Sequence, residues 1–319
     1  KDGNRDHSDG EISLSMLSGS MRGSGPLGKK ATWVFSARRS YYDYMLRLLD
    51  WTDVPIPVFS DVFGRLSFEP DSKHRFLAFL MRSEDGAKAA LEENPSNVDE
   101  GDAFYRQITQ VYGLDWSFMP LEWLLLNTVV SYQILNVDAT LTSATENMYG
   151  HAQANGFYVN EDVMFDLGRN VFKIGGVYSR IDMTLRSAFP ISQYVAGARF
   201  ANEQDTFDIE FDEIDPIEVY GFYAQHEAEI IPNRLRSNVG ARLDHYMATA
   251  DGWVASPRVS MATNLAKETI LKLAWGLYYI PPFNFLATDE ELGNPRLRPE
   301  RQTHYVIGLE QGLGEHMML

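Results

Sequence analysis

Three acidic residues between positions 202 and 215 have a spacing that could hold a cation. Asp208, Glu210 and Asp212 alternate along the chain, so an extended backbone would place their carboxylates on one face. Carboxylate oxygens are ligands that Ca²⁺ prefers, and a bound cation would relieve the repulsion between them. We favour the alternative of a solvated loop, because the glycine and the terminal glutamate of a helix-loop-helix calcium site are missing.

Two further segments have the partial form of a chemical motif. Gly23–Lys30 follows the phosphate-binding pattern G-x-x-x-x-G-K, but Lys30 replaces the hydroxyl residue that would hold Mg²⁺. The residues after it are β-branched and aromatic rather than helix-forming, so we predict a hairpin turn. His226–Glu229 has no second histidine at helical spacing, as a zinc site of this kind needs. We expect His226 near the level of lipid headgroups, because the residues on its face are apolar.

Four aromatic residues flank a pair of prolines, Pro281 and Pro282: they are Tyr278, Tyr279, Phe283 and Phe285. Aromatic side chains on a long exposed loop are candidates for capturing a ligand. An interfacial aromatic belt with ordinary loop packing explains them as well. The chain shows no Ser-His-Asp set, Cys-His set or convincing carboxylate pair, so the sequence gives no support to an enzyme.

The elements that would position these residues are strands with a clear period of two. In the segment 269–280, alternate residues are apolar: Leu271, Leu273, Trp275, Leu277 and Tyr279. The segment 233–246 alternates in the same way, with Arg236, Asn238, Gly240, Arg242 and Asp244 on its polar side. Alternation of this kind predicts strands of a sheet that has one apolar and one hydrated face.

Composition limits the classes of protein that remain. The 319 residues include no cysteine and carry a formal net charge of −16, which excludes a disulfide scaffold and argues against nucleic acid as a partner. The longest apolar runs are far below the roughly 20 residues of a transmembrane helix. The mean hydropathy of −0.26 is still compatible with a membrane barrel, because only alternate residues of its strands face lipid. The first residue is not Met, and we expect a fragment or a processed form.

Five short motifs occur in a fixed order: Tyr223–Gln225, Asn238–Tyr246, Ser256–Ser260, Leu273–Gly276 and Gly293–Glu300. Together they resemble the barrel of TonB-dependent outer-membrane receptors. The positions that carry the resemblance are Asn238, Gly240, Arg242, Asp244, Pro257, Arg258, Asn294, Pro295, Leu297, Pro299 and Glu300.

The resemblance implies an all-β fold, an antiparallel transmembrane β-barrel of which residues 1–319 form a part. We predict about thirteen strands joined by turns that are alternately tight and long, with one strand over 11–22 and helical turns over 42–50. Residues 87–104 and 136–156 are predicted to be long loops. Because plugged transporters have roughly 22 strands, we expect the plug domain and the C-terminal strands to lie outside this chain.

The resemblance also implies active uptake of a scarce solute, such as an iron-siderophore, cobalamin or a sugar. Its implied partners are the TonB energy-coupling protein, reached through a plug, an extracellular solute and outer-membrane lipid, with no cofactor. Six charged residues would project into the lumen as a ladder between strands or as a plug contact: Glu227, Glu229, Arg236, Arg242, Asp244 and Arg258. A passive or structural barrel and a soluble β-rich binding module remain alternatives. We expect the isolated polypeptide to aggregate through its unpaired strand edges.

Overall fold

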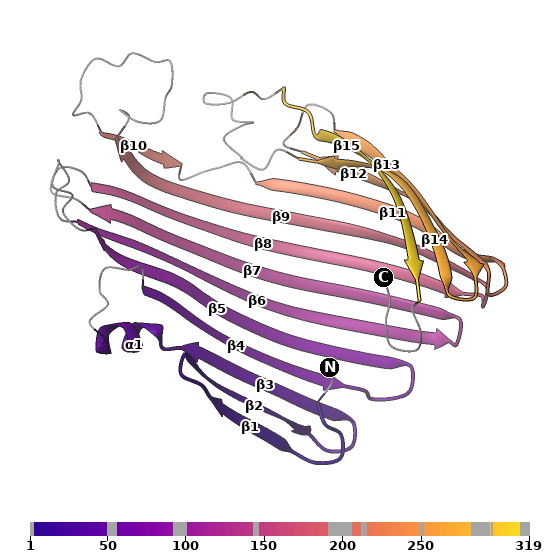
Figure 1. The fold of residues 1–319 in the computed structure, drawn as a ribbon, viewed down its shortest axis with the longest axis horizontal. Helices are drawn as coiled ribbons and strands as arrows, with labels where there is room; N and C mark the ends of the chain where they lie inside the picture. Colours follow the sequence, from indigo (N-terminus) through magenta and orange to yellow (C-terminus); the bar gives the residue numbers. More distant parts are fainter. Residues whose placement is uncertain are drawn as a thin grey trace.

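One antiparallel sheet makes up almost the whole molecule (Figure 1). The computed structural model describes residues 3–49, 56–91, 101–142, 147–190, 206–211, 216–247, 249, 252–281, 294 and 296–312. The strands are β1 (Asp9–Leu14), β2 (Ser18–Pro26), β3 (Ala31–Ser40), β4 (Ile56–Phe68), β5 (His74–Leu91), β6 (Gly101–Leu121), β7 (Leu124–Thr142), β8 (Asn147–Asp166), β9 (Asn170–Pro190), β10 (Thr206–Phe211), β11 (Ile217–Ile231), β12 (Leu235–Tyr246), β13 (Trp253–Ala266), β14 (Thr269–Ile280) and β15 (Glu300–Gln311). The predicted all-β antiparallel fold is confirmed.

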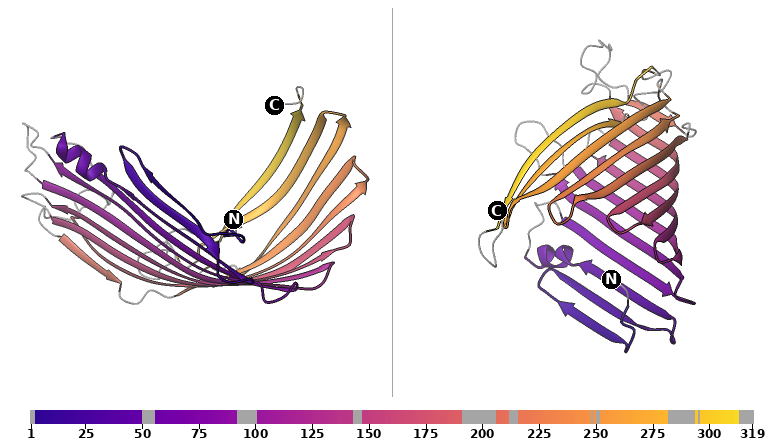
Figure 2. Two further views of the ribbon diagram at one scale, coloured as in Figure 1. Left: turned by 90° about the horizontal axis from the view of Figure 1, so that it is seen from below. Right: turned by 90° about the vertical axis from the view of Figure 1, so that its right-hand side faces the viewer.

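The strands pair in the order of the chain, except that β10 pairs with β9 beside the main path. Figure 2 shows that the sheet curves into an open trough. In the described sheet, β1 and β15 are the two edges, and each pairs with only one strand. The curvature follows from the right-handed twist that L-residues give to every pair of strands.

The two faces of the sheet differ sharply in polarity. Directly paired residues share a face, so the register can be followed from strand to strand, for example from Val259 to Trp275 and on to Tyr305. The apolar face includes Trp33, Leu66, Phe76, Trp116, Val159, Phe172, Phe222, Leu243, Leu273 and Ile307. The opposite face includes Ser36, Asp61, Ser83, Asn127, Asp162, Lys173, Tyr223, Arg242, Arg258 and Lys272. These are the two faces that the alternation predicts.

The polar face is the concave one. The N-terminal residues cross it: the backbone N–H of Asn4 donates to Ser24 Oγ at 3.4 Å, and a side chain at Gly3 would collide with the backbone of Trp33 and with Thr32. Figure 2 places the N-terminus within the curve of the sheet. The apolar face therefore lies on the outside of the trough.

The connections at one end of the strands are tight turns, and we name this the tight-turn end. Gly28 (φ 73°), Gly168 (φ 77°) and Asn233 (φ 57°) adopt the left-handed conformation there, which suits glycine and asparagine. The hairpin predicted for 23–30 is confirmed, with its turn between β2 and β3. The opposite end, where the longer connections lie, is the long-loop end. The predicted strict alternation fails at its first connection, because only residues 15–17 separate β1 from β2.

Three predicted boundaries were wrong. The predicted strand over 11–22 is part of the hairpin of β1 and β2, whose turn lies at residues 15–17. In the predicted loops at 87–104 and 136–156, the residues that the structure describes are all strand, because β5 to β8 continue far toward the long-loop end. The split into β1 and β2 and the additional strand β10 raise the number from about thirteen predicted strands to fifteen among the described residues.

The predicted helical turns over 42–50 are confirmed by α1 (Tyr42–Leu48), which begins just after β3. Within the described residues, no helix has both the length and the apolar character that crossing a bilayer requires.

The apolar face changes character along each strand. Near the tight-turn end, aromatic rings stack on this face. The ring centres of His74 and Phe118 are 4.4 Å apart, and those of His226 and Phe172 are 4.3 Å apart. Toward the long-loop end, the same face becomes charged, as at Arg180, whose guanidinium binds the carboxylate of Asp182 at 2.9 Å. An apolar band flanked by aromatic and then charged residues is typical of strands that cross a bilayer.

Candidate functional site

Among the described residues, the most enclosed charged side chain on the concave face is the carboxylate of Asp244, which is 4% exposed. Arg242, two residues earlier on β12, donates from Nε to Oδ1 at 2.7 Å and to Oδ2 at 2.9 Å. Gly221 lies opposite Asp244 on β11, and a Cβ atom there would stand 2.6 Å from Arg242 Nη2 and from Asp244 Oδ1. The glycine thus makes room for a charge-assisted pair that fixes both side chains.

A second contact joins β11 to β8 across β9. The hydroxyl of Tyr223 donates a hydrogen bond to Asp162 Oδ1. Gly175 lies between them, and a Cβ atom at this position would be 2.5 Å from the Tyr223 ring. The absence of a side chain on β9 therefore lets two strands that are not neighbours bond directly.

A third group of polar side chains lies near the tight-turn end of the same face. Lys173 Nζ is 3.3 Å from Glu227 Oε1, and Gln225 Nε2 donates to the same oxygen at 2.9 Å. Glu229 accepts a hydrogen bond from the backbone N–H of Asn233 at 2.7 Å, which ties the β11–β12 turn to the face. Beside them is a hollow of about 490 Å³, lined partly by Arg236 and Lys272.

These groups form a lattice of fixed charges and hydrogen-bonding groups on a concave wall. Such a wall suits a polar partner that fills the trough, because side chains already held in ion pairs lose little conformational entropy when a partner binds them. In the part of the chain that the structure describes, no cluster of three or more His, Asp or Glu side chains could hold a metal ion.

The predicted charge ladder is on one face, as the register of Glu227, Glu229, Arg236, Arg242, Asp244 and Arg258 shows. Its bonds differ from the prediction in two ways. The Arg242–Asp244 pair lies within one strand, and the contact between neighbouring strands is made by Lys173. Sequence reasoning missed Lys173 and Asp162 and named Tyr223 only as part of a motif, although each stands at a polar position of its own alternating segment.

The predicted ligand-capturing aromatics separate in the structure. Tyr278 faces the trough, and its ring lies 4.8 Å from the ring of His304. Tyr279 belongs to the opposite face. Phe283 and Phe285 lie outside the described residues.

The predicted acidic cation site is only partly described. Residues 206–211 are extended as β10, with Asp208 opposite Ala188 and Glu210 opposite Arg186 of β9. Asp212 lies outside the described residues. The extended backbone is therefore as predicted for two of the three acidic positions, and the cation itself stays a prediction.

The motif residues lie on and beside three strands. Asn238, Gly240, Arg242 and Asp244 are on the concave side of β12, and Arg258 lies opposite Gly240, while Pro257 faces outward on β13. Asn294 accepts a hydrogen bond from the backbone N–H of Arg296 through Oδ1 at 3.0 Å. Leu297 is half-buried and Pro299 buried just before β15, which begins at Glu300. Pro295 lies outside the described residues.

A single curved antiparallel sheet that is apolar outside and charged inside is the wall of a transmembrane β-barrel. Residues 50–316 match the family model for the TonB dependent receptor-like β-barrel. The chain belongs to this family, as the resemblance predicted, and the family is one of outer-membrane receptors. A comparison with curated protein sequences finds no match.

Solved structures share the fold at low sequence identity. A mutant of the ferric enterobactin receptor from Pseudomonas aeruginosa is 13% identical, with a TM-score of 0.69, 98% of this chain covered and 52% of that one. The siderophore receptor PirA from Acinetobacter baumannii is 14% identical, with a TM-score of 0.67 and coverages of 98% and 52%. A copper transporter, OprC, is 11% identical, with a TM-score of 0.69 and coverages of 98% and 53%. The chain spans about half the length of these structures.

Proposed function

We propose that the protein containing this chain is an outer-membrane receptor that imports a scarce solute with energy delivered through TonB. The observation that carries the proposal is the charged concave face of a curved sheet whose other face is apolar. Family membership supports it further. The solute would be an iron-siderophore complex, cobalamin or a sugar. One of the similar structures is named as a ferric enterobactin receptor and another as a siderophore receptor.

The concave lattice would contact a plug domain. Arg242 and Asp244 hold each other in place near the long-loop end, and Lys173 and Glu227 do so near the tight-turn end. Lys173 and Glu227 are both exposed toward the trough, and Arg242 is partly exposed beside the enclosed Asp244, so a plug could hydrogen-bond to them. Because an exposed pair such as Lys173–Glu227 contributes little to stability by itself, its arrangement favours recognition over scaffolding.

Solute contact belongs to the long-loop end. The rings of Tyr278 and His304 are in tilted contact on the concave face there. Tyr279, Phe283 and Phe285 stay candidates for ligand contact from their place around the Pro281–Pro282 loop. Asp208, Glu210 and Asp212 stay a candidate cation site.

The test is uptake by intact cells under iron starvation. Cells with the gene, cells without it and cells lacking TonB are compared for accumulation of radiolabelled ferric enterobactin and of labelled cobalamin. We expect accumulation of one of the two probes to need both the protein and TonB. Accumulation that continues without TonB would favour the passive barrel. Recovery of the protein in the soluble fraction, without detergent, would instead favour the binding module.

A further inference from the structure

A carboxyl group stands in the middle of the outward apolar face, at Glu161 of β8. On the same strand, Phe165 is four residues away toward the tight-turn end, and Phe157 is four residues away toward the long-loop end. Both rings belong to aromatic contacts, with centroid distances of 6.3 Å to Trp123 and 6.4 Å to Tyr178. At about 3.3 Å per residue, Glu161 is about 13 Å along the strand from either ring. It therefore lies where β8 crosses the hydrocarbon.

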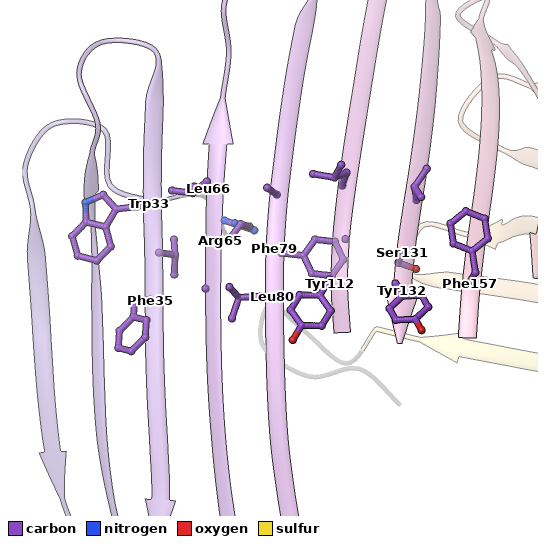
Figure 3. Close-up of a pocket in the computed structure, with 16 residues that line it drawn as sticks. Trp33, Phe35, Arg65, Leu66, Phe79, Leu80, Tyr112, Ser131, Tyr132 and Phe157 are labelled. Atoms are coloured by element: carbon purple, nitrogen blue, oxygen red, sulfur yellow. The ribbon is translucent and has the colours of Figure 1, made fainter. Parts of the chain in front are cut away.

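The outward residues that directly adjoin Glu161 are small or β-branched. They are Val159 and Val163 on β8, Thr128 on β7 and Gly176 on β9. We name these four residues and Glu161 the Glu161 patch. Elsewhere the outward face is uneven, as Figure 3 shows for the large rings that line a hollow of about 600 Å³. Because β-branched side chains have few rotamers, the flatter patch can pack against another surface with little loss of entropy.

The carboxyl group of Glu161 is incompletely bonded within the described part of the chain. The hydroxyl of Thr128 donates a hydrogen bond to Oε2, and no other hydrogen bond or ion pair reaches the group there. On the described parts of β6 to β9 and β11, no lysine or arginine faces outward between the aromatic rings. A polar group in hydrocarbon that lacks partners costs free energy. The position therefore favours a partner from another molecule.

A second copy of the protein has the matching groups at the matching depth. Copies inserted in the same direction are related by rotation about the membrane normal, so the two-fold contact brings each residue to residues of its own depth. Glu161 and Thr128 would then meet a second Glu161 and Thr128. The outward face is convex, so two barrels touch along few strands. The patch spans three strands, or about 10 Å, which fits such a contact.

We propose that the Glu161 patch is the contact between two copies of the protein in the membrane, with their carboxyl groups facing each other across a two-fold axis. The pair shares at least one proton, because two carboxylates at hydrogen-bonding distance do not both stay ionised. Gly176 lets the two backbones approach, and the polar pair fixes their register, as at other contacts within membranes.

The proposal requires that the outward face contacts lipid, and it does not rest on solute transport. It also concerns association and not the stability of a single barrel. When vesicles hold at most one barrel each, no second copy is present, and the carboxyl group of Glu161 only adds a cost in hydrocarbon.

The test is cross-linking of the full-length protein in lipid vesicles with a short bifunctional maleimide. Any cysteine outside residues 1–319 is first replaced by serine. Val163→Cys places a thiol beside Glu161, and Leu273→Cys places one on the outward face of β14, away from the patch. Leu273→Cys is the matched control for random collision. We expect covalent dimers of Val163→Cys to exceed those of the control about tenfold at a low protein-to-lipid ratio.

Three further variants, made together with Val163→Cys, test the role of the carboxyl group. Glu161→Leu removes it, whereas Glu161→Gln keeps a side chain that donates and accepts hydrogen bonds. Gly176→Leu adds bulk beside it, and a Cβ atom there meets Phe222 Cδ1 at an ordinary 3.6 Å. We expect association to weaken about tenfold in Glu161→Leu and Gly176→Leu, which is roughly 1.4 kcal/mol, and to be largely retained in Glu161→Gln.

Each variant is first checked for folding by its heat-dependent mobility in gel electrophoresis. Cross-linking of Val163→Cys that is no stronger than that of Leu273→Cys would overturn the proposal, because it would show collision and no specific contact. Wild-type dimer formation in folded Glu161→Leu would also overturn it, since the carboxyl pair would then contribute nothing to association.

Discussion

The tight-turn half and the long-loop half of β5 to β9 share one ladder of backbone hydrogen bonds, but their outward side chains differ in polarity. On β6, the outward residues change from Phe118, Trp116 and Leu114 to Gln110 and Arg106, while the pairing with β5 continues without a break to Leu91 and Gly101. The sheet itself therefore does not require the apolar alternation. Lipid imposes it, because outward side chains must be apolar only at the level of the hydrocarbon.

The outward face of the long-loop half carries ion pairs instead. His151 Nδ1 lies 2.6 Å from Asp138 Oδ1, and Arg180 reaches both Asp182 and Glu218. All of these groups except Glu218 are substantially exposed, so the His151–Asp138 and Arg180–Asp182 pairs add little stability in water. We infer that backbone hydrogen bonds between the strands stabilise the long-loop half and that its outward surface faces water or lipid headgroups.

The largest expected effect comes from placing a charge on each half of the same strand. Leu114→Arg should destabilise the barrel by about 2–4 kcal/mol, because the guanidinium would face hydrocarbon. Ile108→Arg, six residues away on the same face, should cost about 0.5 kcal/mol or less. The measurement is urea unfolding of the full-length protein folded into lipid vesicles. Equal losses in the two variants would show that the halves do not differ in solvent.

A second prediction compares the enclosed inner pair with an exposed outer pair. Asp244→Ala should cost about 1–3 kcal/mol, because Arg242 loses its acceptor in a crowded position. Asp182→Ala should leave the unfolding midpoint in vesicles unchanged, since water solvates Arg180. Arg242→Leu combined with Asp244→Leu should recover part of the loss. A double variant as unstable as the sum of the single variants would mean that the two side chains are not coupled.

The one carboxylate found at mid-band among the described residues of the apolar face gives the third prediction. Glu161 stands between Val159 and Val163 on that face, opposite Gly176, and its Oε2 accepts a hydrogen bond from Thr128. Glu161→Leu should stabilise the folded barrel by about 1 kcal/mol, because an acidic group in hydrocarbon is unfavourable. Glu218→Leu, on the outward face of the long-loop half, is the control and should change nothing. A loss of stability in Glu161→Leu would show instead that the hydrogen bond from Thr128 outweighs the cost of the carboxylate in hydrocarbon.

The smallest effect concerns a tight turn outside the membrane. The backbone N–H groups of Lys73 and His74 donate to Asp71 Oδ1 at 2.8 and 2.9 Å. These bonds, first that from Lys73, hold the pKa of Asp71 below its ordinary value. The group therefore contributes stability above the unfolded pKa of about 4, and this contribution is lost as the pH falls through the lower folded pKa. In Asp71→Asn, the stability should therefore depend slightly less on pH in this window, as measured by acid unfolding. An acid unfolding curve identical to that of the wild type would contradict a contribution from Asp71.

The fold could be predicted from the sequence in the segments whose outward residues face lipid. Alternation in 233–246 and 269–280 predicted strands and faces correctly, because every outward residue there is constrained. The same reasoning failed at 87–104 and 136–156, since a strand above the membrane has polar residues on both faces and only its backbone pairing defines it. The β1–β2 hairpin was missed because three residues suffice for its turn.

For the candidate site, the sequence predicted which residues share a face of the sheet but not which of them pair. The alternation on β12 placed Arg242 and Asp244 on the concave side, but the partner of Glu227 is Lys173, more than fifty positions earlier in the chain. Pairings of this kind depend on which strands become neighbours and on where glycines such as Gly175 and Gly221 leave room. Neither can be derived from spacing along one segment.

The most direct measurement is a cysteine scan of β14 in vesicles, to which residues 1–319 contribute no natural cysteine. Single cysteines at 271–278 would carry a fluorophore that brominated lipids quench. We predict strong quenching at 271, 273, 275 and 277 and weak quenching at 272, 274, 276 and 278. Uniform quenching, or protection of the odd positions from both lipid and water, would contradict an outward face that contacts the membrane.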